Sequence, residues 1–117
     1  MLFKNTFQNM QGNTVGTQGG ERAANSWNDV MDGINEMLEC EDEFVTLTLA
    51  DIKHNVRYVQ ACYNYDGITV QLGIEVEGGI MLVEKTALSE EECVEIFREF
   101  YETSNVKDVE HYTEVQF

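Results

Sequence analysis

The stretch ITVQLGIEVEGGIMLV, residues 68–83, decides the fold of this chain. From Ile68 to Val76, apolar side chains alternate with polar or small ones, which is the period of a β-strand that buries one face. Glu77-Gly78-Gly79 then supplies residues suited to a tight turn, and residues 80–83 are apolar again. The stretch therefore predicts two antiparallel strands joined by a hairpin turn.

The same alternation extends to both sides of this hairpin. Residues 45–49 and 58–63 alternate in the same way, and Asp66-Gly67 stands where a tight hairpin needs positive φ. Residues 109–117 alternate again and predict a closing strand. We therefore expect an antiparallel β-meander of four to five strands, with one apolar face that helices must cover.

Two stretches of the chain show the period of an amphipathic helix. From Trp27 to Leu38, apolar residues recur at helical spacing, and Ser26 with Asp29 gives a capping signal. A second helix begins at Ser89, which forms an S-x-x-E capping box, and its apolar stripe runs over residues 93–101. The sequence thus predicts an α+β fold with two amphipathic helices packed on one face of the sheet.

The length of 117 residues suits one domain with a single core. Residues 26–117 contain all the predicted elements, so we assign them to a single α+β domain. Residues 1–25 contain four glycines among polar residues, and we expect a flexible or loosely ordered N-terminal segment there.

The three cysteines are an odd number without C-x-x-C spacing, which favours a reducing compartment over a disulfide framework. No apolar run reaches the length of a membrane span, and the first twenty residues lack the apolar core of a signal peptide. We expect a cytoplasmic protein that does not contact a membrane.

No motif in the sequence predicts catalysis. Neither His54 nor His111 has a second histidine or a cysteine pair at metal-ligand spacing, so we expect no metal and no cofactor. Cys62, His54 and Asp51 could be drawn as a nucleophile with its base, but Cys62 lies mid-strand without basic neighbours to activate it. An inert, partly buried thiol is the favoured interpretation, and we expect a binding protein rather than an enzyme.

The charge of the chain indicates the kind of partner. The net charge is -15, and the stretch 26–52 carries eight carboxylates without a lysine or arginine. Such a field repels nucleic acid and raises the encounter rate with basic proteins by about 10 to 1000-fold at low salt. The alternative is a solvated surface that only keeps the protein soluble. The candidate partner-binding residues are the carboxylates of the first helix, its following loop and the second helix: Asp32, Glu36, Glu39, Glu41, Asp42, Glu43, Glu91, Glu95 and Glu99.

A Trp-headed helix at SWNDV (residues 26–30), a strand meander, LSEEECVEIFREFYETS (88–104) and VEHY (109–112) follow one another along the chain. This order resembles the immunity proteins of bacterial polymorphic toxin systems, in the family often found beside deaminase and nuclease toxins. The resemblance covers residues 26–115 loosely and 80–115 best. The chain departs from the family pattern at Ser104-Asn105-Val106, where Gly and Pro are usual, and at Tyr112, which stands in place of a Trp.

The resemblance implies an acidic protein that neutralises a cognate toxin by stoichiometric binding over its basic active-site cleft, without catalysis. Two alternatives remain open at this point. One is a nucleic-acid mimic that inhibits a nuclease, and the other is a domain that binds a small ligand without catalysis. The identity of the toxin and the oligomeric state are not encoded in any motif.

Overall fold

A computed structural model of the chain describes residues 12–115. Within them, seven strands form one sheet, two α-helices cover it, and one short 3-10 helix precedes the last strand. The elements in chain order are β1 (Thr14–Thr17), β2 (Gly20–Ala23), α2 (Trp27–Met37), β3 (Phe44–Thr48), β4 (Val56–Asn64), β5 (Gly67–Val76), β6 (Gly79–Leu88), α3 (Glu90–Thr103), η1 (Val109–His111) and β7 (Thr113–Glu114).

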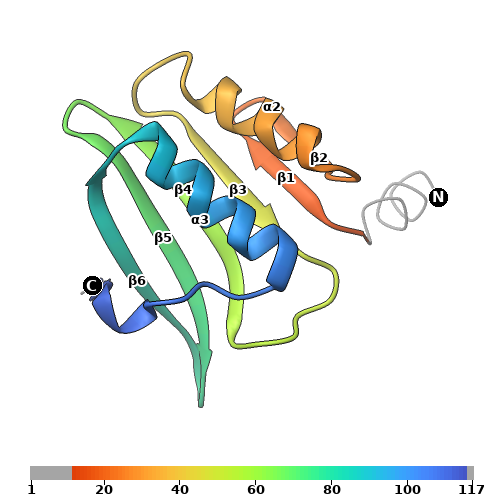
Figure 1. Cartoon of the computed structure of the whole chain (residues 1–117), viewed down its shortest axis with the longest axis vertical. Helices are drawn as coiled ribbons and strands as arrows, with labels where there is room; N and C mark the ends of the chain where they lie inside the picture. The colour runs from red at the N-terminus through yellow and green to blue at the C-terminus, as the bar shows by residue number, and fades with distance from the viewer. Residues whose placement is uncertain (1–11, 116–117) are drawn as a thin grey trace.

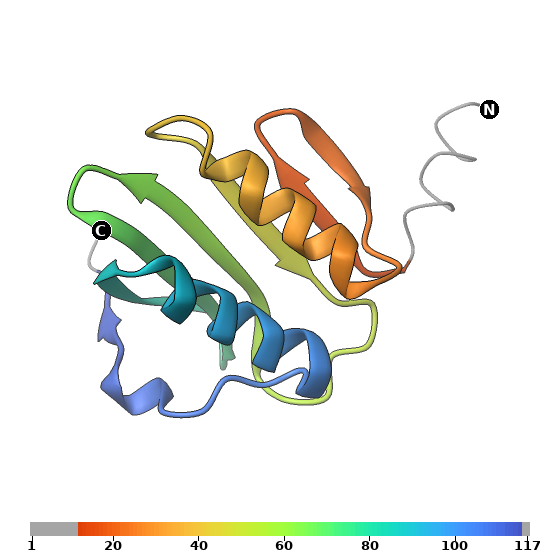
Figure 2. The same ribbon diagram turned by 45° about the horizontal axis from the view of Figure 1, so that its top comes forward.

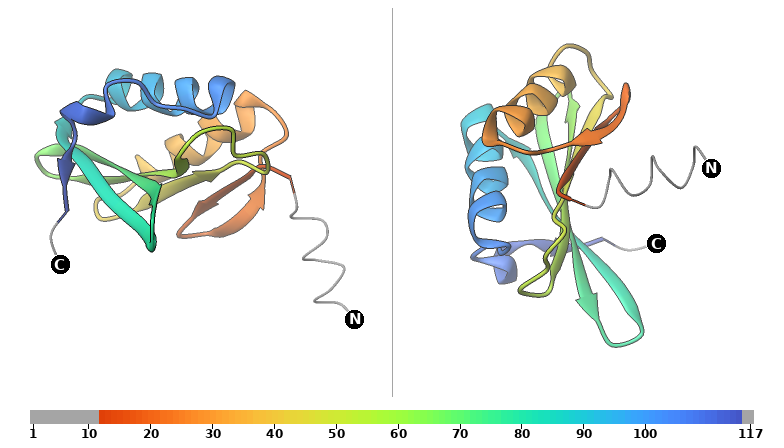
Figure 3. Two further views of the ribbon diagram at one scale, coloured as in Figure 1. Left: turned by 90° about the horizontal axis from the view of Figure 1, so that it is seen from below. Right: turned by 90° about the vertical axis from the view of Figure 1, so that its right-hand side faces the viewer.

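The sheet is antiparallel throughout, with strand order β2-β1-β3-β4-β5-β6-β7. Both helices lie on the same face of this sheet (Figure 1; Figure 3, left). The predicted α+β class is therefore confirmed, while the predicted four to five strands are an undercount. The additional strands lie at the edge that the N-terminal hairpin forms.

That hairpin corrects the expectation of a loosely ordered segment before residue 26. Strand β1 pairs with β2 on one side and with β3 on the other, where Val15 opposes Leu47. Val15 is fully buried. Gly20 adopts φ +119° directly after the two-residue turn, a conformation that glycine adopts without strain. The predicted domain boundary at residue 26 therefore falls within the domain, between β2 and α2. Residues 1–11 of the predicted segment lie outside the described residues.

The closing strand is much shorter than predicted. The chain forms the 3-10 helix η1 over Val109–His111, and only Thr113 and Glu114 pair with β6. Asp108 precedes this turn with φ 60°, and the backbone N–H of Tyr112 donates to the carbonyl of Val109 at 2.9 Å. The turn buries Tyr112, which the predicted alternation had placed on the opposite face from Val109. Residues 116–117 lie outside the described residues.

Both helices begin where the sequence predicts. In α2, the Ser26 hydroxyl accepts from the backbone N–H of Asp29 at 3.4 Å, and the Asp29 carboxylate accepts from that of Ser26 at 3.1 Å. In α3, the Ser89 hydroxyl accepts from the backbone N–H of Glu92 at 3.1 Å, and the Glu92 carboxylate accepts from the backbone N–H of Ser89 at 2.9 Å. These side chains satisfy backbone donors that the first turn of a helix leaves without partners.

The core lies between the helices and the sheet. Phe97 and Phe100 of α3 are fully buried, as are Ile34 and Met37 of α2. The predicted apolar stripes are therefore confirmed. The two helices meet at one end, where the rings of Trp27 and Tyr101 lie 5.7 Å apart between centroids and inclined by 52°.

The other face of the sheet carries no helix among the described residues (Figure 3). Its polar side chains pair across strands: Thr46 donates to Gln60 at 2.9 Å, and Gln71 donates to Glu84 at 3.1 Å. The ring of Tyr58 covers Gly73, because Tyr58 on β4 is paired directly with Gly73 on β5. This face is thus closed by cross-strand contacts rather than by a second layer.

Candidate functional site

The two helices lie alongside each other across the sheet, so residues more than fifty positions apart form one surface (Figure 2). Asp32 on α2 and Glu39 directly after it are exposed, as are Glu91 and Glu95 on α3. We call these four residues the acidic helical surface. Their carboxylates form no ion pair or hydrogen bond with residues 12–115. None of these four carboxylates is therefore engaged by another side chain of the described fold; Glu91 lies in the first turn of α3, where its charge favours the helix dipole.

One cation interrupts this surface. Arg98 forms an ion pair with Glu102 at 3.2 Å, one turn further along α3. Its guanidinium also lies 5.3 Å from the ring centroid of Trp27 on the neighbouring helix, a cation–π distance. Arg98 is thus occupied by contacts within the fold and leaves the acidic helical surface negative.

Glu36, a predicted partner-binding residue, faces the N-terminal hairpin instead. Its carboxylate accepts from the Thr17 hydroxyl and forms an ion pair with Arg22 at 3.2 Å. The hydrogen bond from Thr17 lowers the pKa of Glu36 below its usual value; burial opposes this effect, and the charge of Arg22 adds to it. Glu36 therefore ties α2 to β1 and β2, a contact within the fold.

The three predicted loop carboxylates also differ in whether the fold engages them. Glu41 and Asp42 are exposed, whereas Glu43 accepts a hydrogen bond from the side-chain amide of Gln18. The loop itself is anchored to the end of β4, since the backbone N–H of Asp42 donates to the carbonyl of Tyr63 at 2.7 Å. Glu41 and Asp42 are thus exposed on a loop with a fixed base, and the charge of Asp42 acts on Cys62 of β4.

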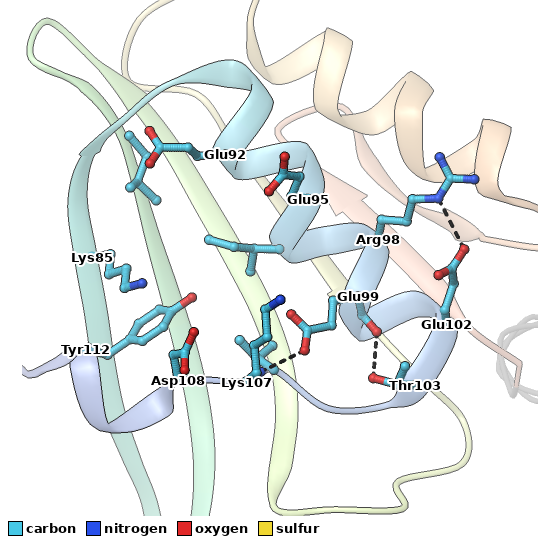
Figure 4. Close-up of a pocket in the computed structure, with 13 residues that line it drawn as sticks. Lys85, Glu92, Glu95, Arg98, Glu99, Glu102, Thr103, Lys107, Asp108 and Tyr112 are labelled. Atoms are coloured by element: carbon cyan, nitrogen blue, oxygen red, sulfur yellow. Dashed lines mark hydrogen bonds and ion pairs between the residues drawn. The ribbon is translucent and has the colours of Figure 1, made fainter.

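Glu99 points to the opposite flank of α3, away from α2. Its carboxylate accepts from the backbone N–H of Lys107 at 2.9 Å. On this flank a cavity of about 520 Å³ lies between α3, β6 and the segment 106–112 (Figure 4). We call it the α3 pocket. The residues that line it include Lys85, Ile96, Glu99, Lys107, Asp108 and Tyr112.

Tyr112 forms one wall of the α3 pocket and is 8% exposed. Its hydroxyl points into the pocket and forms no hydrogen bond with the described part of the chain (Figure 4). Burial, followed by the charges of Glu99 and Asp108, raises the pKa of Tyr112 to about 12. The hydroxyl therefore keeps its proton at neutral pH and can donate a hydrogen bond to a bound group.

Two lysines reach the same pocket. The ammonium of Lys85 lies 4.7 Å from the ring centroid of Tyr112, and Lys107 enters from the segment that follows α3. Within residues 12–115, neither ammonium forms an ion pair with a carboxylate. Sequence reasoning missed this pocket because it combines three separate stretches, and the unexpected burial of Tyr112 completes it.

The nucleophile drawn from Cys62, His54 and Asp51 is not assembled. His54 and Asp51 lie in the loop before β4, whereas Cys62 lies near the far end of that strand. At about 3.3 Å per strand residue, Cys62 is roughly 20 Å along β4 from its first residue. Burial, followed by the charge of Asp42, also raises the pKa of the Cys62 thiol. The favoured interpretation of an inert thiol agrees with this geometry.

One group of potential metal ligands occurs in the described residues: Asp108, Glu110 and His111, whose ligand atoms lie within 4.8 Å of one another. All three are exposed, and exposed acidic groups of this kind are common without an ion. The group therefore does not assign a metal site. In residues 12–115, neither α-helix has the length and apolar character needed to cross a membrane.

Comparison of the chain with protein-family models, with curated proteins and with solved structures gave no match. The resemblance to immunity proteins thus rests on the sequence features that carry it. The surfaces described above come from the geometry of this chain alone.

Proposed function

We propose that this protein is an acidic binding module that recognises a basic partner protein through its acidic helical surface. The observation that carries the proposal is the division among the predicted carboxylates. Glu36, Glu43 and Glu99 are engaged within the fold, whereas Asp32, Glu39, Glu91 and Glu95 lie outward on one layer without intramolecular partners. Glu41 and Asp42 are exposed on the loop that follows α2.

The biological form that we propose is an immunity protein, in keeping with the resemblance of residues 80–115. An enzyme that acts on nucleic acid has a basic cleft, and a small acidic protein bound over that cleft blocks access of the substrate. Neutralisation of this kind is stoichiometric and requires no catalytic residue. The partner is then a nuclease or deaminase toxin.

A nucleic-acid mimic has less support from the same surface. Asp32 and Glu39 are seven residues apart, which is about 10 Å along a helix axis. A duplex carries one phosphate charge per about 1.7 Å of its axis, so its charge density is several times higher. The spacing favours recognition of particular basic residues over imitation of a phosphate backbone.

The test uses the protein encoded beside this gene as the partner and isothermal titration calorimetry as the measurement. Wild-type protein should form a 1:1 complex and abolish the toxicity of that partner when both are expressed together. The double variant Asp32→Lys/Glu95→Lys should bind more weakly by about 1 to 3 kcal/mol per substitution if both residues lie in the contact.

The matched control is Glu77→Lys/Glu114→Lys, which changes the net charge equally at exposed positions outside the helices. It should reduce only the association rate and leave the dissociation rate near the wild-type value. Equal losses in both variants would show that only the overall field matters. Absence of a 1:1 complex would refute the immunity form of the proposal.

Ionic strength gives a second measurement. Raising the salt concentration from about 50 mM to about 500 mM should lower the association rate with the partner by about an order of magnitude or more, because salt screens exposed charges. A rate that barely changes would indicate an apolar interface and would contradict recognition through the acidic helical surface.

A further inference from the structure

The α3 pocket contains a hydrogen-bond donor, the Tyr112 hydroxyl, that has no acceptor within the described residues and is open to the solvent in the pocket. Tyr112 is more than nine-tenths buried, yet its hydroxyl opens into the pocket and has no partner in residues 12–115. A group bound in the pocket can accept a hydrogen bond from Tyr112 in place of water.

The surroundings of that hydroxyl favour an anionic group. Lys85 lies over the Tyr112 ring, and the Lys107 side chain extends into the same cavity (Figure 4). Neither of these ammonium groups forms an ion pair in the described structure, although the charge of Lys85 contributes to lowering the pKa of Glu92 after the backbone and side-chain hydrogen bonds of Ser89. A carboxylate held between Tyr112, Lys85 and Lys107 would satisfy all three donors.

A simple anion does not fit the rest of the pocket. Carboxylates also line it, from Glu92, Glu95, Glu99, Glu102 and Asp108, and they outnumber the cations Lys85, Arg98 and Lys107. The net negative lining repels a ligand that carries only negative charge. A ligand that also carries an ammonium group would be attracted to the carboxylates of Glu95 and Glu99 on the α3 side.

We propose that the α3 pocket binds a small zwitterion of the free amino acid class. Tyr112, Lys85 and Lys107 hold the carboxylate of the ligand, and the carboxylates of α3 hold its ammonium group. Leu88, Ile96 and Val106 supply an apolar wall for the side chain of the ligand. The cavity of about 520 Å³ falls in the range of small-molecule sites, which is roughly 300 to 1000 Å³.

This site goes beyond the proposed partner binding, and the two sites share one residue, Glu95. The α3 pocket lies on the flank of α3 that faces β6, and Asp32, Glu39 and Glu91 of the acidic helical surface do not line it. The Tyr112→Phe substitution removes the hydroxyl but leaves every charge of the protein unchanged. A loss of amino acid binding in that variant therefore reports on the pocket alone, and binding of a basic partner should be unaffected.

The experiment titrates the full chain with each of the twenty free amino acids and follows backbone amide resonances by NMR. At least one amino acid should shift residues 85, 96, 107 and 112 with a dissociation constant below about 1 mM, or 4 kcal/mol of binding free energy. Its deaminated and decarboxylated analogues should bind at least about tenfold more weakly, since each lacks one of the two charges.

Two variants and one control complete the test. Tyr112→Phe and Lys107→Met should each weaken binding about tenfold or more, since each removes a donor to the ligand carboxylate. Tyr65→Phe is the matched control, because Tyr65 is 89% exposed in the β4–β5 turn, and it should bind as the wild type does.

The spectrum and melting temperature of each variant establish that it is folded. The proposal is overturned if no amino acid shifts the pocket resonances at about 10 mM, ten times the expected dissociation constant. It is also overturned if the carboxylic acid analogue binds as tightly as the amino acid. An unchanged affinity for the amino acid in both folded variants, Tyr112→Phe and Lys107→Met, would also contradict the proposal.

Discussion

Gly33 of α2 lies directly against Val15 of β1, so that a Cβ atom at position 33 would stand 2.6 Å from Cγ2 of Val15. The same Cβ would lie 3.1 Å from Cγ2 of Val45 on β3. Both valines are fully buried and β-branched, which leaves them little freedom to move aside. Glycine at this position sets how closely the first helix approaches the N-terminal part of the sheet.

We predict that Gly33→Ala destabilises the protein even though alanine is the better helix former. Helix propensity favours alanine by about 1 kcal/mol, whereas overpacking a core costs about 1 to 3 kcal/mol. Chemical denaturation should therefore give a net loss of stability. Asn35→Ala on the exposed side of the same helix is the control and should be neutral or slightly stabilising. A more stable Gly33→Ala protein would show that α2 does not approach β1 this closely.

We predict that Phe97→Ala removes a large share of the folding free energy. Phe97 is fully buried between α3 and the sheet, and truncation of a buried phenylalanine costs about 3 to 5 kcal/mol. A domain of this size is stable by about 5 to 15 kcal/mol. Denaturant unfolding should show this loss, while Glu91→Ala on the exposed face should stay within about 0.5 kcal/mol of wild type. A melting temperature close to that of the wild type would contradict the assigned buried face.

The link between Thr17 and Glu36 predicts a dependence of stability on pH. The hydrogen bond from Thr17 holds the pKa of Glu36 below its ordinary value of 4.5. The contribution of this carboxylate is therefore complete above pH 4.5 and is lost as the pH falls through the lower folded-state pKa. Thr17→Val should raise the pKa of Glu36 and reduce the loss of stability in this acid range.

NMR titration of the Glu36 carboxyl carbon and unfolding at several pH values measure the two effects. Thr48→Val, on the exposed part of β3, is the control and should leave the titration of Glu36 unchanged. A Glu36 titration that is identical in wild type and Thr17→Val would show that the hydroxyl does not bind this carboxylate.

The three cysteines should differ in reactivity in the folded protein. Cys40 is exposed, Cys62 is half-buried, and Cys93 is buried, with burial as the main cause that raises the pKa of its thiol to about 12. Because the thiolate is the reactive form, a thiol reagent should label Cys40 first and Cys93 only after unfolding. Cys40→Ser should abolish the rapid phase. Rapid labelling of Cys93 would mean that α3 is not packed on the sheet.

The helices could be predicted from sequence because their signals are local. Ser26 and Ser89 cap turns that begin at the next residue, and the side chains that bond to them lie three positions away. The strands around residues 56–88 could be predicted for the same reason, since alternation and the Asp66-Gly67 and Gly78-Gly79 turns are neighbours in the chain.

The N-terminal hairpin lacked such a signal. Strands of four residues do not persist alone, and β1 is ordered by pairing with β3, whose Leu47 lies 32 residues after Val15. Gly19 and Gly20, two of the four glycines that indicated a flexible segment, instead lie in and directly after the β1–β2 turn. The prediction of a long closing strand was wrong for a related reason. The turn that follows Asp108 interrupts the alternation, so that Tyr112 is buried.

The sequence by itself determined the charge of this protein, the starts of its helices and the apolar stripes that these helices bury. Which carboxylates are free for a partner was decided only by the tertiary structure. Asp32 and Glu36 are one turn apart on α2 and are chemically alike, yet Glu36 meets Thr17 and Arg22 while Asp32 meets solvent. The difference arises because the hairpin packs beside one flank of the helix, and that packing depends on strand pairing between distant parts of the chain.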